Sequence, residues 1–425
     1  MSTATAPTAD DTPKVIDVVS PKTLVVFALA VVALTAMQLF GTQEGSSTFR
    51  FATSTDFFAI PNLTVPTTAT VWVLVAVLAV ITAESLRRLL AHRRTPGWLI
   101  AVFAVVAMTA FLTWSGAGAT LPVVGLFSGT ILLAVPLVFG AMGGVLGERV
   151  GVVNIAIEGQ LLAGAFTAAV VASMFGSAWA GVLGAMVAGA LVGLVLAVFA
   201  ITYWVEQVIV GVVLNVLVIG FTNFMFGQVL TENADTLNSP ERLTPWAVPL
   251  LSDIPLVGPV LFKQSPLVYL LYVVVAVLAW SLYKTKWGLR VRAVGEHPKA
   301  ADTVGIKVIA TRYRTVILAG AIAGVGGAFY SLVAVQGFNR EMTGGAGYIA
   351  LAAVIFGKWD PIKATLAALL FGFASNLQGT LSVIGAPVPS EFMLMLPYLV
   401  TLLAVAGFVG KSRAPAATGI PYRKS

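Results

Sequence analysis

The sequence contains no cysteine and only two histidines, His92 and His297. The absence of cysteine excludes disulfide bonds, thiolate catalysis and cysteine-ligated metal sites. Two isolated imidazoles also leave a metal ion almost without ligands, and the carboxylates form no evident acid–base pair. We therefore expect that the protein is not an enzyme and binds no metal.

Charged residues are also scarce. Only 10% of the 425 residues are charged, 58% are hydrophobic, and the mean hydropathy is +0.94. A soluble domain is about one quarter charged, so this chain has too few charges to cover a surface in water. The net charge of +7 does not indicate nucleic acid, because the basic residues cluster beside the ends of apolar segments. The composition predicts an integral protein of the lipid bilayer.

Apolar segments of helical length follow one another along most of the chain. A helix needs about 20 apolar residues to cross a bilayer, so we predict an all-α polytopic bundle of about 10–12 transmembrane segments. The segment at 344–357 is short and is expected to be a broken or re-entrant element. Glycine pairs spaced four apart, such as Gly189/Gly193 and Gly320/Gly324, indicate tight helix crossings. The candidate crossings are residues 23–40, 67–86, 97–114, 123–146, 158–175, 178–202, 207–230, 266–283, 313–335, 344–357, 361–378 and 392–410.

The distribution of the basic residues predicts the orientation of these segments in the membrane. If the N-terminus is inside and every segment crosses, only Arg50, Arg242, Lys263 and Arg340 of the 25 Lys and Arg residues lie outside. The positive-inside rule favours this orientation. We therefore predict a multi-pass protein of the bacterial plasma membrane with both termini in the cytoplasm. The expected parts are a disordered cytoplasmic tail at 1–21, a transmembrane domain at 22–410 and a second cytoplasmic tail at 411–425.

Two long polar intervals interrupt the apolar pattern. The external interval 231–265 is rich in proline and indicates either an ordered cap or docking surface, or a plain connecting loop. The internal interval Lys284–Arg314 holds eight of the 25 basic residues but only two acids, Glu296 and Asp302. Within it, the sequence PKAAD at 298–302 predicts a short helix with a smooth face of small residues. Charge alone would also fit an inert loop.

Polar residues also gather in the run GERVGVVNIAIEGQLLAG, Gly147–Gly164. Asn154 and Glu158 lie four residues apart and would share one face of a helix. Asn154 could cap the next helix while Glu158 complements its positive end. Alternatively, the glycine-bracketed run lines a cavity. Asn215, deep within another segment, either makes an interhelical hydrogen bond or belongs with Asn154 and Glu158 to a solute path.

Three stretches carry a resemblance to a known family and occur in its order. They are GERVGVVNIAIEGQLLAGAF from Gly147, LRVRAVGEHPKAADTVGIKV from Leu289, and GGAGYIALAAVIFGKWDP from Gly344. They resemble the permease subunits of ATP-binding-cassette (ABC) importers for nucleosides and simple sugars, which are related to ribose and branched-chain amino acid permeases. The resemblance spans roughly residues 122–410 and leaves the loop 231–265 unplaced.

The resemblance implies a permease fold that forms the membrane path for a small-molecule solute, a nucleoside or a simple sugar. It implies three protein partners: a cytoplasmic ABC ATPase, a second homologous permease and an extracytoplasmic substrate-binding lipoprotein. ATP and Mg²⁺ would be used by the ATPase, and this chain would hold no cofactor. Its run Gly407–Ser412 resembles a phosphate-binding loop but has Val405 where the first glycine is required. The segment 287–312 would couple to the ATPase through six residues, Gly295, Glu296, Pro298, Ala300, Ala301 and Gly305.

A different class of transporter is the alternative. A secondary transporter for a small polar solute, driven by an ion gradient, would place ionisable residues near the bilayer midplane. The acids considered for this role are Glu158 and Glu206, and both are close to segment ends. The sequence therefore favours the ABC permease.

Overall fold

The computed structural model describes residues 20–52, 60–386 and 413–423, together with 388, 391, 392 and 395. Within these residues, ten helices are long and apolar enough to cross a membrane, and Ala346–Phe356 is a shorter apolar helix. The predicted all-α polytopic fold is confirmed. Most of the predicted tail 1–21 and of the crossing 392–410 lies outside the described residues.

The long helices follow the predicted segments closely, whereas no strand was predicted from the sequence. The long helices are α1 (Lys22–Phe40), α2 (Thr67–Leu90), α3 (Gly97–Ser115), α4 (Val123–Arg149), α5 (Ile157–Phe175), α6 (Ala178–Ala197), α7 (Gln207–Met225), α9 (Pro266–Lys284), α12 (Val308–Phe329) and α14 (Pro361–Val383). The short helices are α8 (Ala234–Leu237), α10 (Lys286–Glu296), α11 (Pro298–Thr303) and α13 (Ala346–Phe356). The π-helical turns are η1 (Val198–Thr202), η2 (Phe226–Leu230), η3 (Gly258–Phe262) and η4 (Tyr330–Ala334). The strands are β1 (Ser46–Arg50), β2 (Leu63–Pro66), β3 (Thr120–Pro122), β4 (Trp246–Ala247) and β5 (Lys263–Gln264).

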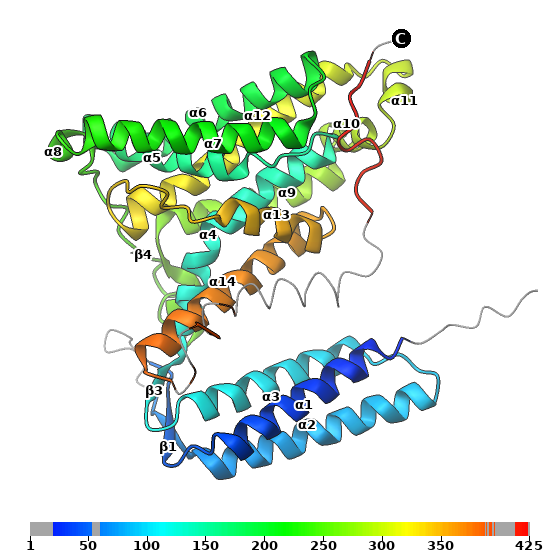
Figure 1. Ribbon diagram of the computed structural model, residues 1–425, viewed down its shortest axis with the longest axis vertical. Coiled ribbons are helices and arrows are strands. Elements are labelled where there is room, and N and C mark those ends of the chain that lie inside the picture. Colours follow the sequence, from blue (N-terminus) through cyan, green and yellow to red (C-terminus); the bar gives the residue numbers. More distant parts are fainter. Residues whose placement is uncertain are drawn as a thin grey trace, which may run out of the picture. The chain divides into compact units, whose positions relative to one another are not determined.

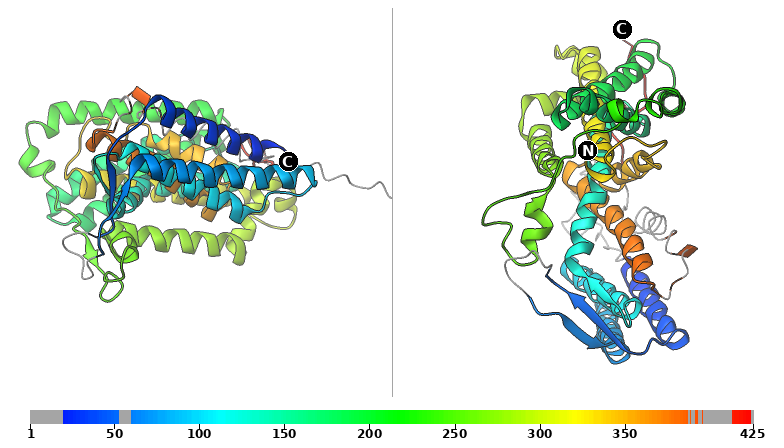
Figure 2. Two further views of the ribbon diagram at one scale, coloured as in Figure 1. Left: turned by 90° about the horizontal axis from the view of Figure 1, so that it is seen from below. Right: turned by 90° about the vertical axis from the view of Figure 1, so that its left-hand side faces the viewer.

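The chain folds into two compact units, where the sequence suggested one transmembrane domain over 22–410. The first unit contains α1, α2 and α3, with the three-stranded sheet β2-β1-β3 at one end of the helices (Figures 1 and 2). β1 and β2 are antiparallel, with Ser47 opposite Val65. The buried Ser47 hydroxyl donates to the carbonyl of Thr113 at 2.6 Å and pairs with the Thr67 hydroxyl at 2.8 Å. These bonds join the sheet to the ends of α2 and α3.

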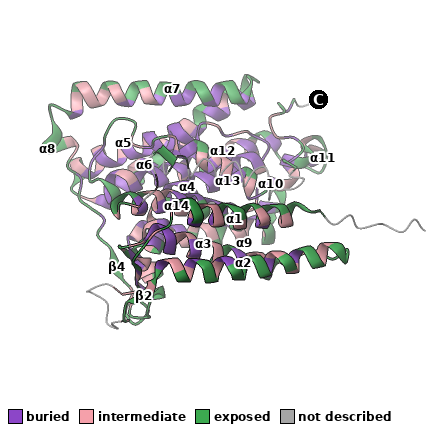
Figure 3. Cartoon of the chain, turned by 60° about the horizontal axis from the view of Figure 1, so that its bottom comes forward, coloured by how far each residue is buried: buried purple, intermediate pink, exposed green. Residues whose placement is uncertain are grey.

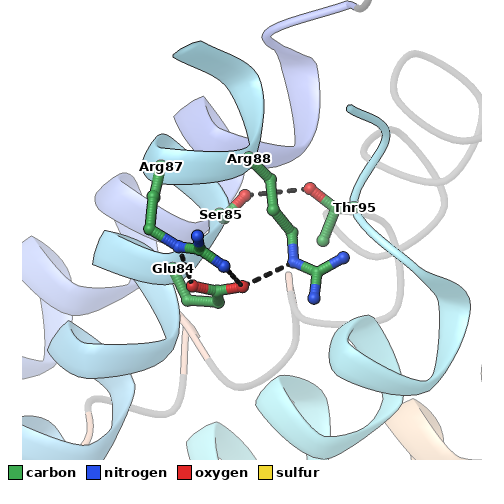
Figure 4. A network of polar contacts seen from close by, with 5 residues as sticks. All are labelled: Glu84, Ser85, Arg87, Arg88 and Thr95. Atoms are coloured by element: carbon green, nitrogen blue, oxygen red, sulfur yellow. Dashed lines mark hydrogen bonds and ion pairs between the residues drawn. The ribbon is translucent and has the colours of Figure 1, made fainter. Parts of the chain in front are cut away.

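The opposite end of the first unit is polar. Glu84 accepts hydrogen bonds from Arg87 at 2.7 Å and from Arg88 at 2.6 Å (Figure 4). Ser85 and Thr95 are joined by a 3.0 Å hydrogen bond between their hydroxyls, which ties α2 to the turn before α3. The turn between α2 and α3, with Arg87 and Arg88 beside it, is the basic end of this unit.

The second unit is built around α4 and α12. In Figure 3 these helices are mostly buried, whereas α7 presents a long exposed face. α6 and α12, far apart in the sequence, lie against each other over much of their length. A β-carbon at Gly189 would overlap the carbonyl oxygen of Gly320, and one at Gly324 would overlap that of Ala185. Such close backbone approach gives membrane helices their packing energy, since lipid provides no hydrophobic drive between them. The glycine pairs therefore mark a tight helix crossing, as predicted.

The polar interval 231–265 is folded, with α8, β4, η3 and β5 in it. It is hydrogen-bonded to the turn η4 and to Phe338, which follows this turn. The Leu243 N–H donates to the carbonyl of Leu332 at 3.0 Å, and Arg242 donates to that of Val333. The Asn238 side chain accepts from the Phe338 N–H at 2.6 Å and donates to the Phe338 carbonyl at 3.0 Å. The interval is an ordered cap on this end of the bundle.

Candidate functional site

The turn 150–156 between α4 and α5 carries the first of the predicted site residues. Asn154 is fully buried and exchanges two hydrogen bonds with Gln160, at 3.1 and 3.2 Å. α5 begins at Ile157 after Ala156, and no side chain caps it. The capping role that the sequence allowed for Asn154 is therefore wrong. The residue instead ties the turn to the first residues of α5.

Glu158 acts on a different helix from its own. Its carboxylate, only 4% exposed, accepts hydrogen bonds from the Thr343 hydroxyl at 2.6 Å and from the N–H groups of Gly345 at 2.9 Å and Gly347 at 2.6 Å. These donors form the start of the short helix α13. The first N–H groups of a helix have no partner within it, and a negative charge is favourable there. Glu158 therefore fixes the beginning of the broken membrane element that the sequence predicted at 344–357.

Asn215, on α7, is 1% exposed and joins three elements. Its side-chain oxygen accepts from the Gly159 N–H at 2.8 Å, and its nitrogen donates to the Ile155 carbonyl at 2.9 Å and the Tyr348 hydroxyl at 3.2 Å. A β-carbon at Gly159 would lie 3.0 Å from the Asn215 side-chain oxygen, so the glycine makes room for this contact. The structure thus gathers all three predicted solute-path residues at the start of α5. Each uses its polar atoms in protein hydrogen bonds.

The other end of α13 is held by residues that the sequence reading did not single out. α13 ends at Phe356, and Lys358 and Trp359 adopt left-handed backbone conformations with φ of 55° and 56°. The Trp359 indole N–H donates to the carboxylate of Glu148, and the Arg149 Nε donates to the Trp359 carbonyl at 2.8 Å. The sequence signal that could have identified these residues is the charged pair Glu148-Arg149, which directly follows an apolar segment.

The coupling segment forms two helices, α10 and α11, and the predicted helix at 298–302 is confirmed. Its last predicted residues, 308–312, belong instead to α12. Gly295 is buried at the end of α10, where a β-carbon would overlap the carbonyl oxygen of Arg149. Ala301 is also buried.

The remaining predicted coupling residues lie on the other face. Glu296, Ala300 and Gly305 are exposed and Pro298 is partly exposed. Val304, beside them, is an apolar side chain that is 75% exposed. The predicted coupling residues therefore fall into two groups. Gly295 and Ala301 pack against the bundle, whereas Ala300 and Gly305 lie on the exposed surface.

Residues 413–423, part of the predicted C-terminal tail, pack against the coupling segment (Figure 1). We call them the C-terminal strap. The Ala417 N–H donates to the Gly295 carbonyl at 2.8 Å, the Thr418 hydroxyl donates to that of Glu148 at 3.2 Å, and Arg312 donates to that of Ile420 at 3.1 Å. The strap thus joins α10, the end of α4 and the start of α12. Burial of the Tyr422 hydroxyl raises its pKa, and the neighbouring Asp302 carboxylate adds to the effect.

Residues 126–405 match the family described as the permease component of the branched-chain amino acid transport system. The chain belongs to this family. The three motif stretches lie within the matched region, so the predicted membership is confirmed. The helices of the first unit precede the match. Membership makes this chain a multi-pass membrane permease.

Individual relatives agree with the family. The chain is 42% identical over 304 residues to the guanosine ABC transporter permease protein NupQ of Bacillus subtilis, which covers 69% of this chain and 95% of the relative. It is 41% identical over 308 residues to the nucleoside ABC transporter permease protein NupC of Lactococcus lactis, with the same coverage, 69% and 95%. A putative glucose ABC transporter permease, TsgC13 of Haloferax volcanii, is 37% identical over 254 residues, covering 60% and 77%. No solved structure matches the chain.

Proposed function

We propose that this protein is the permease subunit of an ABC importer that takes up nucleosides. The observation that carries the proposal is the identity of 42% and 41% to permeases named for guanosine and for nucleosides, in matches that cover 95% of each. The match to the putative glucose permease is weaker, at 37%, and covers 77% of that relative. These figures favour nucleosides over simple sugars as the solute.

The same comparisons favour a partner permease of a second type. Bacillus subtilis and Lactococcus lactis each have another permease described in the same way, NupP for guanosine and NupB for nucleosides, which are 27% and 24% identical to this chain. This chain therefore resembles one member of each pair far more than the other. We propose that it assembles with a NupP-like or NupB-like permease. A pair made of two copies of this chain would lack the second permease type that both of these organisms have.

The other proposed partners are a cytoplasmic ABC ATPase and an extracytoplasmic substrate-binding lipoprotein. Ala300 on α11 and Val304 directly after this helix form an exposed surface that suits the ATPase because it is smooth and partly apolar. ATP and Mg²⁺ belong to that ATPase, and this chain holds no cofactor. Both termini would be cytoplasmic, which places the interval 231–265 outside, where the lipoprotein delivers the solute.

The contacts suggest how a conformational change of the ATPase is transmitted to the membrane helices. α10 meets the end of α4 where the Gly295 backbone packs on Arg149. Arg149 and Glu148 hold the turn after α13 through Trp359. The other end of α13 is bound to Glu158. Displacement of α10 would therefore shift α13 and the residues around it, including the proposed solute-path residues Asn154, Glu158 and Asn215.

An ion-driven transporter fits these contacts less well. Glu158 and Glu206, the two acids that the sequence suggested for ion coupling, both accept hydrogen bonds within the protein. The Glu158 carboxylate accepts three hydrogen bonds, and Glu206 accepts from the Ile209 N–H at 2.8 Å and caps α7. A proton-coupling carboxylate must change its protonation during each cycle, which would break such contacts.

The direct test is reconstitution in liposomes with the NupP-like permease, the ATPase and the binding protein. We expect uptake of labelled guanosine that requires ATP inside the liposomes and is not inhibited by excess glucose. An ATPase variant that binds but does not hydrolyse ATP is the control. Uptake by this chain alone under a proton gradient would refute the ABC assignment. Uptake of glucose without nucleoside uptake would refute the proposed solute.

A further inference from the structure

A cavity of about 610 Å³ lies within the second unit. Its walls are the N-terminal half of α4, the end of α12 with η4, one residue of α14, and the ordered interval 231–265. This is the opposite end of α4 from Arg149 and the coupling segment. Small-molecule sites typically measure about 300–1,000 Å³, so the cavity is large enough for a nucleoside.

Uncharged polar side chains form part of the lining of this cavity. Ser265 is 1% exposed, and its buried hydroxyl has no hydrogen-bond partner in the described structure. Ser265 precedes α9, but its side chain does not cap that helix. A buried hydroxyl left without a partner costs about 1–3 kcal/mol. A solute hydroxyl or amide in the cavity would remove that cost.

Asn376, on α14, is held in place at the cavity wall. Its nitrogen donates to the Leu126 carbonyl at 2.6 Å. A β-carbon at Gly129 would lie 2.6 Å from the side-chain oxygen of Asn376, so only glycine leaves room for this amide beside α4. Gln264 also lines the cavity, is 2% exposed, and donates to the Val260 carbonyl at 2.7 Å. The cavity therefore offers a hydroxyl and two oriented amides.

The rest of the lining selects among solutes. Leu133, Phe329 and Val333 supply an apolar wall. Arg242 and Lys263 line the cavity, whereas no Asp or Glu lies among its described lining residues. This electrostatic balance disfavours cations. An apolar wall facing hydroxyl and amide groups suits an uncharged solute with one flat apolar part and one hydroxyl-rich part, which is the chemistry of a nucleoside.

We infer that this cavity is the site at which the permease receives its nucleoside on the side opposite the coupling segment. Ser265 and Asn376 contact the solute, and the interval 231–265 forms one wall of the site. The inference rests on the proposed nucleoside transport. It gives the interval 231–265, which the family resemblance leaves unplaced, a role in solute binding.

The test uses the complete reconstituted importer and labelled guanosine. Ser265→Ala removes a buried hydroxyl that has no protein partner, so the melting temperature should not fall. We expect its KM for guanosine to rise about tenfold, the effect of one hydrogen bond of typical strength. Leu133→Trp, which fills the cavity, should abolish uptake. Val213→Trp is the control, because Val213 lies on the exposed face of α7 and is 58% exposed.

The outcomes separate this inference from the proposed function. If the wild-type importer takes up no nucleoside, the proposed function is refuted first. If it does, and both cavity variants keep the wild-type KM and rate, the inference is wrong while the function stands. Loss of uptake in Leu133→Trp with an unchanged KM in Ser265→Ala would also overturn it, because the cavity would then be needed without binding the solute through Ser265.

Discussion

The carboxylate of Glu158 accepts a 2.6 Å hydrogen bond from the backbone N–H of Gly347, the second residue of α13. Glu148 accepts a hydrogen bond from Trp359, in the turn that follows the same helix. The two glutamates flank the turn 150–156. Each holds one end of α13, although the partners are 189 and 211 residues apart in the sequence. This arrangement ties the broken helix to the region that the coupling segment contacts.

Removing the Glu158 carboxylate should destabilise the protein and reduce uptake. Glu158→Ala leaves two buried donors and one partly buried donor without their acceptor, and each buried unsatisfied group costs about 1–3 kcal/mol. Glu158→Gln should be intermediate, because its amide nitrogen faces an N–H donor. The measurements are the melting temperature in detergent and guanosine uptake. Glu232→Gln, at an exposed position, is the control. Wild-type stability in Glu158→Ala would show that the α13 contacts are dispensable.

The crossing of α6 and α12 should not tolerate a methyl group. Gly324→Ala would overlap the Ala185 carbonyl, and overpacking of this kind costs about 1–3 kcal/mol. Gly220→Ala is the matched control, because no atom lies within 4 Å of the added β-carbon. Alanine is the better helix former by about 0.5–1 kcal/mol, so the control should be as stable as the wild type or more so. Equal melting temperatures for the two variants would contradict the tight crossing.

The two faces of the coupling segment should respond differently to substitution. Gly295→Val pushes α10 away from Arg149 and should lower both the melting temperature and ATP-dependent uptake. Val304→Glu changes an exposed side chain and should leave the melting temperature unchanged. It should instead weaken co-purification of the ATPase by an order of magnitude, since a desolvated, unpaired charge is costly at an interface. Normal ATPase binding by Val304→Glu would place the docking face elsewhere.

The C-terminal strap should be needed for coupling. Ending the chain after Arg413 removes the hydrogen bonds to Gly295, Glu148 and Arg312. We expect a lower melting temperature and loss of most ATP-dependent uptake, because α10 would then be less firmly joined to α4 and α12. The control is a chain that ends after Arg423, which keeps every one of these contacts. If both truncated chains transport guanosine equally well, the strap has no part in coupling.

Much of this fold could be predicted because the lipid bilayer constrains the composition and length of each crossing helix. A crossing helix must be apolar over about 20 residues, so helix bounds such as Ile157–Phe175 lie within a residue or two of the predicted ones. The short helix after Pro298 and the broken segment at α13 were also apparent, since proline, glycine and segment length act on nearby residues. An exception is α12, which begins at Val308 instead of 313. The fully buried Arg312 lies inside it, packed under the strap.

The sequence by itself determined the membrane class, the positions of the long apolar helices that the structure describes, and the family, because these depend on composition and on contiguous motifs. It also identified Glu158 and Asn215 as unusual, since a polar side chain in lipid needs a partner. Only the tertiary structure decided who those partners are, that Gly295 and Ala301 face the bundle while Val304 faces outward, and that 231–265 forms a cavity wall. These facts depend on contacts between residues that are far apart in the chain. The local sequence around each residue does not indicate which distant residues it will contact.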